Sequence, residues 1–172
     1  KSRDRGVFID EAVHHYPADY WRFYIAKMLP TNHDTNFSWA DFESEVNNVL
    51  NDTVGNFVNR TLSLSEQWFD SEVPVGELRS EDEEVVEEAE TAVENYREAF
   101  ENKKLQEALD HAIELARIGD RYLSKEEPWN NEEIREETIH VALQIIRGIG
   151  ATLYPFMPET SEEIQEMLNV NI

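Results

Sequence analysis

The sequence predicts an all-α protein, in which a helix bundle over residues 39–172 follows a short N-terminal appendage over residues 1–38. Three observations lead to this prediction. Apolar residues recur at steps of three and four over most of the chain, as they do along one face of an α-helix. Segments that contain Pro or Gly, such as SEVPVGELR and EEPWNN, separate these periodic stretches. No internal repeat of fixed period is evident, which argues against a solenoid.

The first 30 residues predict a loop and two short helices. KSRDRGVFID lacks a helical period, so we expect a loop that leads into a strand-like piece or a turn. Asp10 is suited to cap a short helix through EAVHHY. Pro17 is suited to the first turn of a second helix, PADYWRFYIAKML, because proline lacks the backbone N–H that is unpaired there. Pro30 is expected to end that helix.

One long amphipathic helix is predicted from about Trp39 to Asp70, a length of about 45 Å. Ser38 is a plausible N-cap for it, because a serine side chain accepts a hydrogen bond from the first turn. The apolar stripe of this helix recurs at steps of four and three and consists of Val46, Leu50, Val54, Phe57, Thr61, Leu64 and Trp68.

Four further helices complete the predicted bundle. Ser80 starts the first of them, and Glu83 three residues later completes a capping-box pattern. The next runs from about Leu105 to Leu123 and ends before EEPWNN, since the residue before a proline disfavours the helical region. Another runs from about Glu132 to Tyr154. ETSEEIQEMLN forms a short last helix.

Composition narrows the classes of function. The chain has 172 residues, of which 40% are hydrophobic, so it can bury a core. It has no Cys, which excludes disulfides, thiolate catalysis and thiolate metal sites. No apolar run approaches the roughly 18 residues of a membrane-spanning helix, and no secretion signal is visible. We therefore expect a soluble protein without a membrane partner, and the absence of Cys fits a cytoplasmic location.

The charge balance is the strongest compositional feature. A net charge of −22, from 15 Lys and Arg against 37 Asp and Glu, would repel a polyanion at low salt. The acidic residues are concentrated in residues 80–101 and 125–137, so other faces can be neutral or locally basic. Multimolar salt would screen the repulsion. The composition is consistent both with a salt-adapted source and with an ordinary acidic helical protein.

No metal site or self-sufficient active site is expected. His14 and His15 are adjacent on a short helix and point in different directions. Glu137 and His140 have the spacing used in di-iron bundles, but such a site needs that motif twice and two further carboxylates. The glutamates of residues 80–101 lack apolar surroundings that would raise their pKa, so they indicate a solvated face.

Two features stand out from this background. Asn56 and Arg60 in GNFVNR lie one helical turn apart, on one flank of the apolar stripe when the wheel is drawn at 100° per residue. Together they can bind the edge of a nucleobase or a phosphate, or else hydrogen-bond neighbouring helices or loops. Trp129 follows Pro128 in a polar connection, where it can stack on a base or fold back as a lid on the bundle.

These motifs occur in an order that resembles the C-terminal part of a methionyl-tRNA synthetase, a class Ia enzyme. Lys1 and Ser2 resemble the last two residues of the KMSKS signature. PADYWRFYIAKMLP and DTNFSWADF resemble the stem-contact region, NDTVGNFVNR resembles the start of the anticodon-binding helix, and EPW resembles the Pro-Trp pair at the base of the bundle. The resemblance covers essentially the whole chain.

The resemblance implies a function for each singled-out residue. Asn56 and Arg60 would contact anticodon bases, mainly the first, cytosine, and Trp129 would stack on an anticodon base. Lys1 would stabilise the phosphates of ATP, which is a substrate, with Mg, of the full-length enzyme. The expected partners are tRNA(Met) and the catalytic domain of the same chain, not DNA. This fragment lacks the Rossmann catalytic half and is not expected to catalyse the reaction or hold a cofactor by itself.

The sequence departs from the family pattern in places. Asp4 and Arg5 separate the KS pair from its usual glycine, Asp120 replaces a more frequent Asn, and Asn130 and Asn131 replace a basic residue. The last two changes would weaken phosphate contacts at low salt. A competing hypothesis is an acidic helical interaction module that binds a protein, not RNA, through the surface around Trp21, Trp39 and Trp68.

Overall fold

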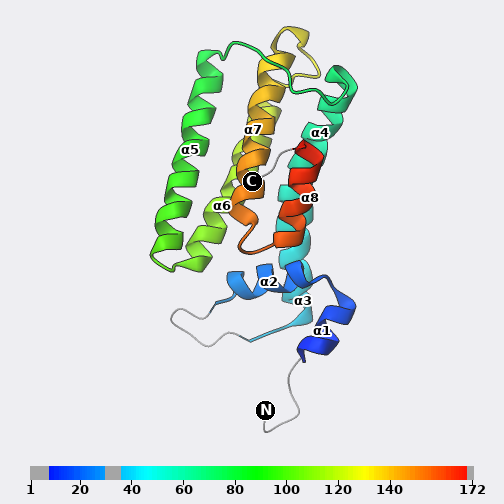
Figure 1. Ribbon diagram of the computed structural model, residues 1–172, viewed down its shortest axis with the longest axis vertical. Coiled ribbons are helices and arrows are strands. Elements are labelled where there is room, and N and C mark those ends of the chain that lie inside the picture. Colours follow the sequence, from blue (N-terminus) through cyan, green and yellow to red (C-terminus); the bar gives the residue numbers. More distant parts are fainter. Residues whose placement is uncertain (1–7, 30–35, 170–172) are drawn as a thin grey trace.

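The computed structural model describes residues 8–29 and 36–169 and is helical throughout, with no β-strand in those residues. Five long segments, α4 to α8, run side by side as a bundle, and α1 to α3 lie at one end of it (Figure 1). The all-α prediction is confirmed. None of the helices in the described part of the chain is both long and apolar enough to cross a membrane.

The N-terminal part consists of α1 (Ile9–His15) and α2 (Ala18–Lys27). The expected strand-like piece or turn is wrong for Ile9 and Asp10, because both belong to α1. The capping role of Asp10 is also wrong, because the N-cap is Phe8, whose backbone is extended and whose side chain makes no capping bond. Pro30 and residues 1–7, which include Lys1, lie outside the described residues.

The predicted long helix is continuous, but it is not α-helical throughout. It consists of α3 (Trp39–Glu45), the π-helix η1 (Val46–Gly55) and α4 (Asn56–Phe69). Ser38 is its N-cap as predicted, since the Ser38 hydroxyl accepts a hydrogen bond of 3.1 Å from the Asp41 backbone N–H. Over η1 the backbone bonds reach back five residues, so each residue turns through less than the 100° of an α-helix. A wheel drawn at 100° per residue is therefore wrong between Val46 and Gly55, although the steps of four keep Val46, Leu50 and Val54 buried.

The remaining helices are α5 (Ser80–Glu101), α6 (Leu105–Glu126), the 3-10 turn η2 (Glu132–Ile134), α7 (Arg135–Leu153) and α8 (Pro158–Leu168). The predicted start of α5 is correct, but its capping box is displaced by one residue. Arg79 is the N-cap, and the carboxylate of Asp82 accepts a bond of 2.8 Å from the Arg79 backbone N–H.

The core of the bundle is centred on α6 and α7. The fully buried aliphatic side chains come mostly from these two helices and include Leu109, Ile113, Leu115, Ile118, Leu123, Ile139, Ile146 and Ile149. Helix α6 contacts α2, η1, α4, α5 and α7, whereas α5 packs mainly on α6 and α7 and presents a long acidic face to solvent. Polar residues on α6 can therefore lie next to side chains from distant parts of the sequence.

Candidate nucleic-acid interface

The structure brings Arg60 and Trp129 into direct contact. The Arg60 Cζ atom lies 4.4 Å from the centre of the Trp129 indole ring, within the range of a cation–π interaction. Arg60 comes from the second turn of α4, and Trp129 comes from the turn after α6. Two features that the sequence analysis singled out separately thus belong to one site.

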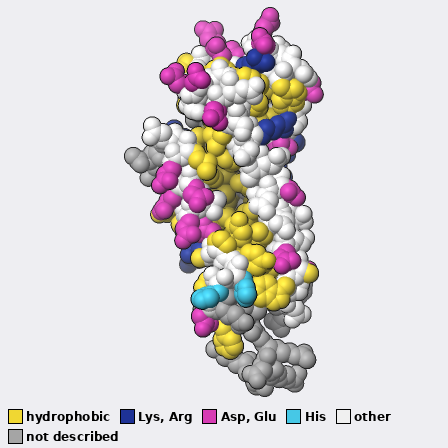
Figure 2. Space-filling view, turned by 90° about the vertical axis from the view of Figure 1, so that its right-hand side faces the viewer, with side chains coloured by type: hydrophobic (Ala, Val, Ile, Leu, Met, Phe, Trp, Pro, Cys, Tyr) yellow, Lys and Arg dark blue, Asp and Glu magenta, His cyan; other side chains and the backbone are white. Residues whose placement is uncertain are grey.

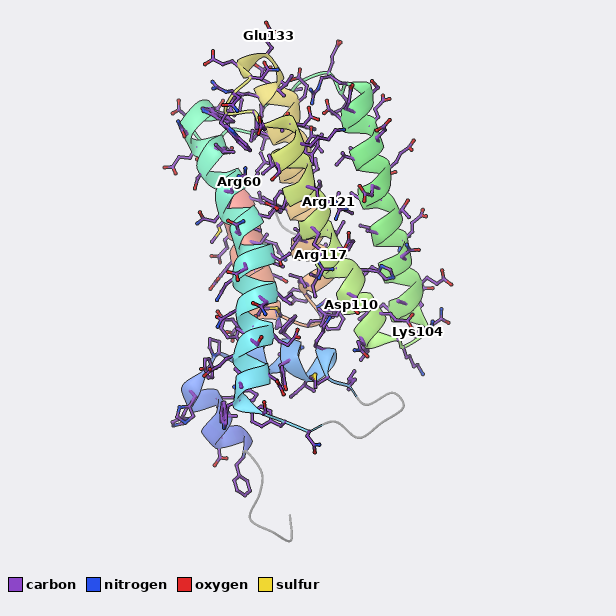
Figure 3. The ribbon with its side chains drawn as sticks, turned by 180° about the vertical axis from the view of Figure 1, so that it is seen from behind. Arg60, Lys104, Asp110, Arg117, Arg121 and Glu133 are labelled. Atoms are coloured by element: carbon purple, nitrogen blue, oxygen red, sulfur yellow. The ribbon has the colours of Figure 1, made fainter. Side chains whose placement is uncertain are left out.

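Arg60 is half-buried between α4 and α6. Its Nη1 atom lies 3.4 Å from Asp120 Oδ1 and 3.4 Å from Ser124 Oγ, two acceptors that are one turn apart on α6. The side chains of Arg60 and Asp120 are 31% and 41% exposed, so the ion pair is open to solvent on one side. In Figure 3, Arg60 lies on α4, and Arg117 and Arg121 mark the neighbouring α6. Arg60 therefore makes hydrogen bonds to a neighbouring helix, which was one of the two roles that the sequence left open for it. These bonds also give the guanidinium a defined position.

Trp129 stands on a short turn that is held at both ends. Glu127 ends α6 in the left-handed conformation, with φ of 47°, and its carbonyl accepts a bond of 2.8 Å from the Asn130 N–H. On the other side, Arg135 Nε donates to the Pro128 carbonyl at 3.0 Å. Trp129 remains 36% exposed. The indole is thus fixed against Arg60 and still has surface that a ligand can reach.

Asn56 is more exposed than the wheel predicted. It is the first residue of α4, one turn before Arg60 and on the same side of the helix. Its side-chain amide makes no hydrogen bond to the described part of the chain and is exposed, rather than lying at the boundary of the core. The site therefore combines the exposed, free amide of Asn56 with the contact between Arg60 and Trp129.

The end of α6 is held from its other side by a buried polar network. The Asp82 carboxylate is fully buried and accepts bonds from Arg79 Nε at 2.8 Å and from the Tyr122 hydroxyl at 2.6 Å. Arg79 also pairs with Glu126 at 2.9 Å. Burial alone would raise the pKa of Asp82, but the bonds from Arg79 and Tyr122 outweigh it, so the pKa lies below its usual value. Burial, and secondly the bond to Asp82, raise the pKa of the Tyr122 phenol.

Sequence reasoning missed several residues of this region. Ser124 follows Asp120 at a spacing of four on a predicted helix, and that spacing is the only signal that pointed to it. Arg135 makes a second arginine–tryptophan contact, with its Cζ atom 4.3 Å from the Trp68 ring centre. No sequence pattern signalled that Arg135 would also bond the carbonyl beside Trp129.

The metal alternatives find no support in the described residues, which contain no group of three or more His, Cys, Asp or Glu side chains that could hold an ion. His140 instead lies with Nδ1 at 2.8 Å from the Pro74 carbonyl.

The surface required by the competing interaction-module hypothesis is not continuous. Trp21 is buried and lies 5.6 Å from Trp39, ring centre to ring centre, within an aromatic cluster at the α1–α3 end. Trp68 lies at the opposite end of the long helix, near the end of α4, and contacts Arg135. Figure 2 shows a different apolar strip, hollowed at its middle. A groove of about 550 Å³ lined by residues of η1, α4, α7 and α8, among them Leu62, Leu143 and Met167, lies there.

Comparison with known proteins places this geometry in a family. Residues 1–62 match the family described as tRNA synthetases class I (M), and residues 73–171 match the anticodon binding domain of methionyl tRNA ligase. The methionine–tRNA ligase of Thermococcus kodakarensis is 36% identical over 174 residues, which cover 98% of this chain and 24% of that protein. The one of Korarchaeum cryptofilum is 39% identical over 177 residues, covering 99% and 31%.

The fold agrees with a solved structure of Mycobacterium tuberculosis methionyl-tRNA synthetase in complex with methionyl-adenylate. The TM-score is 0.88 at 22% identity, over 96% of this chain and 34% of that one. The chain thus spans about a quarter to a third of the length of the relatives it matches. Because the second family match takes in more than half of its residues, the chain belongs to the methionyl-tRNA synthetase family and carries that family's anticodon-binding domain.

Proposed function

We propose that this chain is the part of a methionine–tRNA ligase that recognises the CAU anticodon of tRNA(Met), and that Asn56, Arg60 and Trp129 bind its bases. The observation that carries the proposal is the contact of 4.4 Å between the Arg60 guanidinium and the Trp129 ring, on an exposed surface beside the free amide of Asn56. Stacked aromatic and guanidinium planes are the groups on which proteins bind unpaired RNA bases.

Each residue has a distinct task in this proposal. The exposed part of the Trp129 indole stacks on a base, which is tolerant of base identity. Arg60 and Asn56 supply the donors and the acceptor that distinguish one base edge from another. A well-formed bidentate contact contributes about 1–3 kcal/mol of discrimination, because a wrong base leaves polar groups unpaired. The first anticodon base, cytosine, is the proposed partner of Arg60.

The whole protein would ligate methionine to tRNA(Met), with ATP and Mg as further reactants. Lys1, which lies outside the described residues, is proposed to stabilise the ATP phosphates in the catalytic half of the same polypeptide. We retain residues 1–38 as the KMSKS-loop end and stem-contact region and residues 39–172 as the anticodon-binding domain. The same proposal includes a cytoplasmic location and excludes DNA and a membrane as partners.

The test is a fluorescence titration of a CAU stem-loop and of a stem-loop with a changed first base, from low to multimolar KCl. We expect wild type to prefer the CAU loop, and Arg60→Ala and Trp129→Ala to lose that preference while their circular dichroism spectra stay helical. Arg97→Ala is the control, because Arg97 is an exposed arginine of α5, a helix that lies across the bundle from α4 (Figure 1).

The control should keep wild-type affinity and discrimination. Full discrimination in both Arg60→Ala and Trp129→Ala would show that the site is assigned wrongly. Absence of RNA binding by wild type at every salt concentration would favour a protein-binding module instead.

A further inference from the structure

Asp120 is the acidic neighbour of the proposed anticodon site, and its position is unusual for a site that receives a polyanion. Its Oδ1 atom lies 3.4 Å from Arg60 Nη1, while Ser124 Oγ lies 3.4 Å from the same nitrogen. The centre of the Trp129 ring lies 4.4 Å from the guanidinium Cζ. The cation that the RNA would meet is thus already paired with a carboxylate before any RNA arrives.

We infer that Asp120 determines what Arg60 can bind: it orients the guanidinium and offsets its charge, so that Arg60 contacts a nucleobase edge and not a phosphate. This inference rests on the proposed function of Arg60 and adds a residue to it. Asp120 is a positioning residue here, because it acts on RNA through Arg60.

The geometry of the guanidinium is the first argument. Its Nη1 end is directed at Asp120 and Ser124, and its Cζ atom lies 4.4 Å from the centre of the Trp129 ring. Across residues 8–29 and 36–169, Arg60 Nε and Nη2 make no further hydrogen bond. The free edge therefore presents a pair of parallel donors at a fixed angle, which is what a flat base edge with two acceptors requires.

The local charge is the second argument. A phosphate that approached Arg60 Nη1 would come within a few ångströms of the Asp120 carboxylate, well inside the roughly 10 Å Debye length at 0.1 M salt. The repulsion offsets the attraction of Arg60, whereas an uncharged base edge meets no such repulsion. The carboxylate is 41% exposed, so salt weakens the repulsion without removing the hydrogen bond geometry.

Salt dependence separates the two kinds of contact. Each phosphate neutralised by a free cation on single-stranded nucleic acid adds about 0.7 to the slope of log affinity against log salt, because counterions are released. An arginine that binds a base, with its charge offset by a carboxylate, adds little. Arg60 should therefore contribute to base preference and hardly at all to the salt slope of wild type.

The test measures binding of the CAU stem-loop and of the loop with a changed first base, at several KCl concentrations, for the 172-residue chain. The variants are Asp120→Asn, Arg60→Ala and the double variant. In Asp120→Asn we expect the salt slope to steepen by about 0.7 and the preference for the CAU loop to fall at least fivefold. Arg60→Ala should lose the preference and keep the wild-type slope.

The double variant shows whether Asp120 acts through Arg60. With Arg60 removed, Asp120→Asn should no longer change the slope, because no freed cation is present. Glu114→Gln is the matched control, since Glu114 is also an acid of α6 paired with arginines, at 3.2 Å from Arg117 and 3.0 Å from Arg121. It should alter neither slope nor preference.

The outcomes are distinguishable. If wild type prefers the CAU loop and Asp120→Asn has the same salt slope and the same preference as wild type, this inference is overturned and the proposed function stands. If Asp120→Asn changes the salt slope equally in wild type and in Arg60→Ala, the effect is a general effect of charge, and the inference is also overturned. Absence of any CAU preference in wild type overturns the proposed function, and this inference with it.

Discussion

The ring of Phe57 lies directly against Gly119, so closely that a Cβ atom added to Gly119 would stand 2.1 Å from Phe57 Cζ. Phe57 is on α4, within one turn of Arg60, and Gly119 is on α6, immediately before Asp120. This contact brings α4 and α6 together at the level of the Arg60–Asp120 pair. The phenyl ring can reach this position only because Gly119 has no side chain.

Gly119→Ala is therefore expected to destabilise the bundle. The added methyl group overlaps a fully buried ring, and overpacking of this kind costs about 1–3 kcal/mol. Urea unfolding followed by circular dichroism would measure the loss. The matched control is Gly148→Ala in α7, where the added Cβ would lie 3.6 Å from Leu115 Cδ1, an ordinary contact. That variant should be as stable as wild type or gain up to about 1 kcal/mol, because alanine favours a helix. Equal stability of the two variants would contradict the proposed close contact.

Asp82→Ala should be strongly destabilising at neutral pH. It leaves Arg79 and Tyr122 without their buried acceptor, and breaking a buried charge pair costs on the order of 3 kcal/mol. The free energy of unfolding at pH 7, from urea titration, measures this cost. Glu84→Ala, on the solvated face of the same helix, is the control and should change stability little.

The same carboxylate makes stability depend on acid pH. Since the pKa of Asp82 is lowered in the folded state, its contribution is fully present above the unfolded pKa of about 3.9 and is lost as pH falls through the lower folded value. Asp82→Asn, which cannot titrate, should be less stable than wild type at pH 7. The difference between the two should shrink between about pH 4 and pH 2. A constant difference over that range would show that folding does not lower the pKa of Asp82.

Arg135→Lys should loosen Trp129 without unfolding the protein. Lysine keeps the positive charge, but it lacks the Nε that donates to Pro128 and the planar group that stacks on Trp68. Fluorine NMR of protein labelled with 5-fluorotryptophan measures this, with the Trp129 signal assigned by Trp129→Phe. We expect the Trp129 signal to narrow and to shift toward that of a solvated indole. Arg97→Lys, on the exposed face of α5, should leave the spectrum unchanged.

The acidic face of α5 predicts a stability that increases with salt. Glu84, Glu87 and Glu94 are exposed, and they repel one another and the rest of a chain with net charge −22. From 0.05 to 0.5 M KCl, the melting temperature of wild type should rise by roughly 4 °C, or about 1 kcal/mol. Replacing these three glutamates with glutamine should reduce the rise. An undiminished rise would assign the salt effect to another part of the surface.

The helix boundaries show how far periodicity alone predicts this fold. The extent of the helix from Trp39, its cap at Ser38 and the burial of Phe57 follow from local rules, because capping and amphipathicity depend on residues within a few turns. The π-helical segment Val46–Gly55 does not follow from them. Steps of four suit both helix types, so the apolar spacing does not distinguish them, and the wheel that placed Asn56 at a boundary carried this error.

Arg60 and Trp129 could each be identified from the sequence, but their contact could not be predicted from it. Local patterns in the sequence identified Arg60 as a polar residue beside the apolar stripe and Trp129 as an aromatic residue in a polar connection, and the resemblance to a family suggested a shared role. Only the packing of α4 on α6 decided that they touch, that Asp120 and Ser124 complete the arrangement, and that Arg135 supports it. The physical reason is range: helix propensity acts over a few residues, whereas contacts between residues 60, 120, 129 and 135 exist only after distant helices have packed.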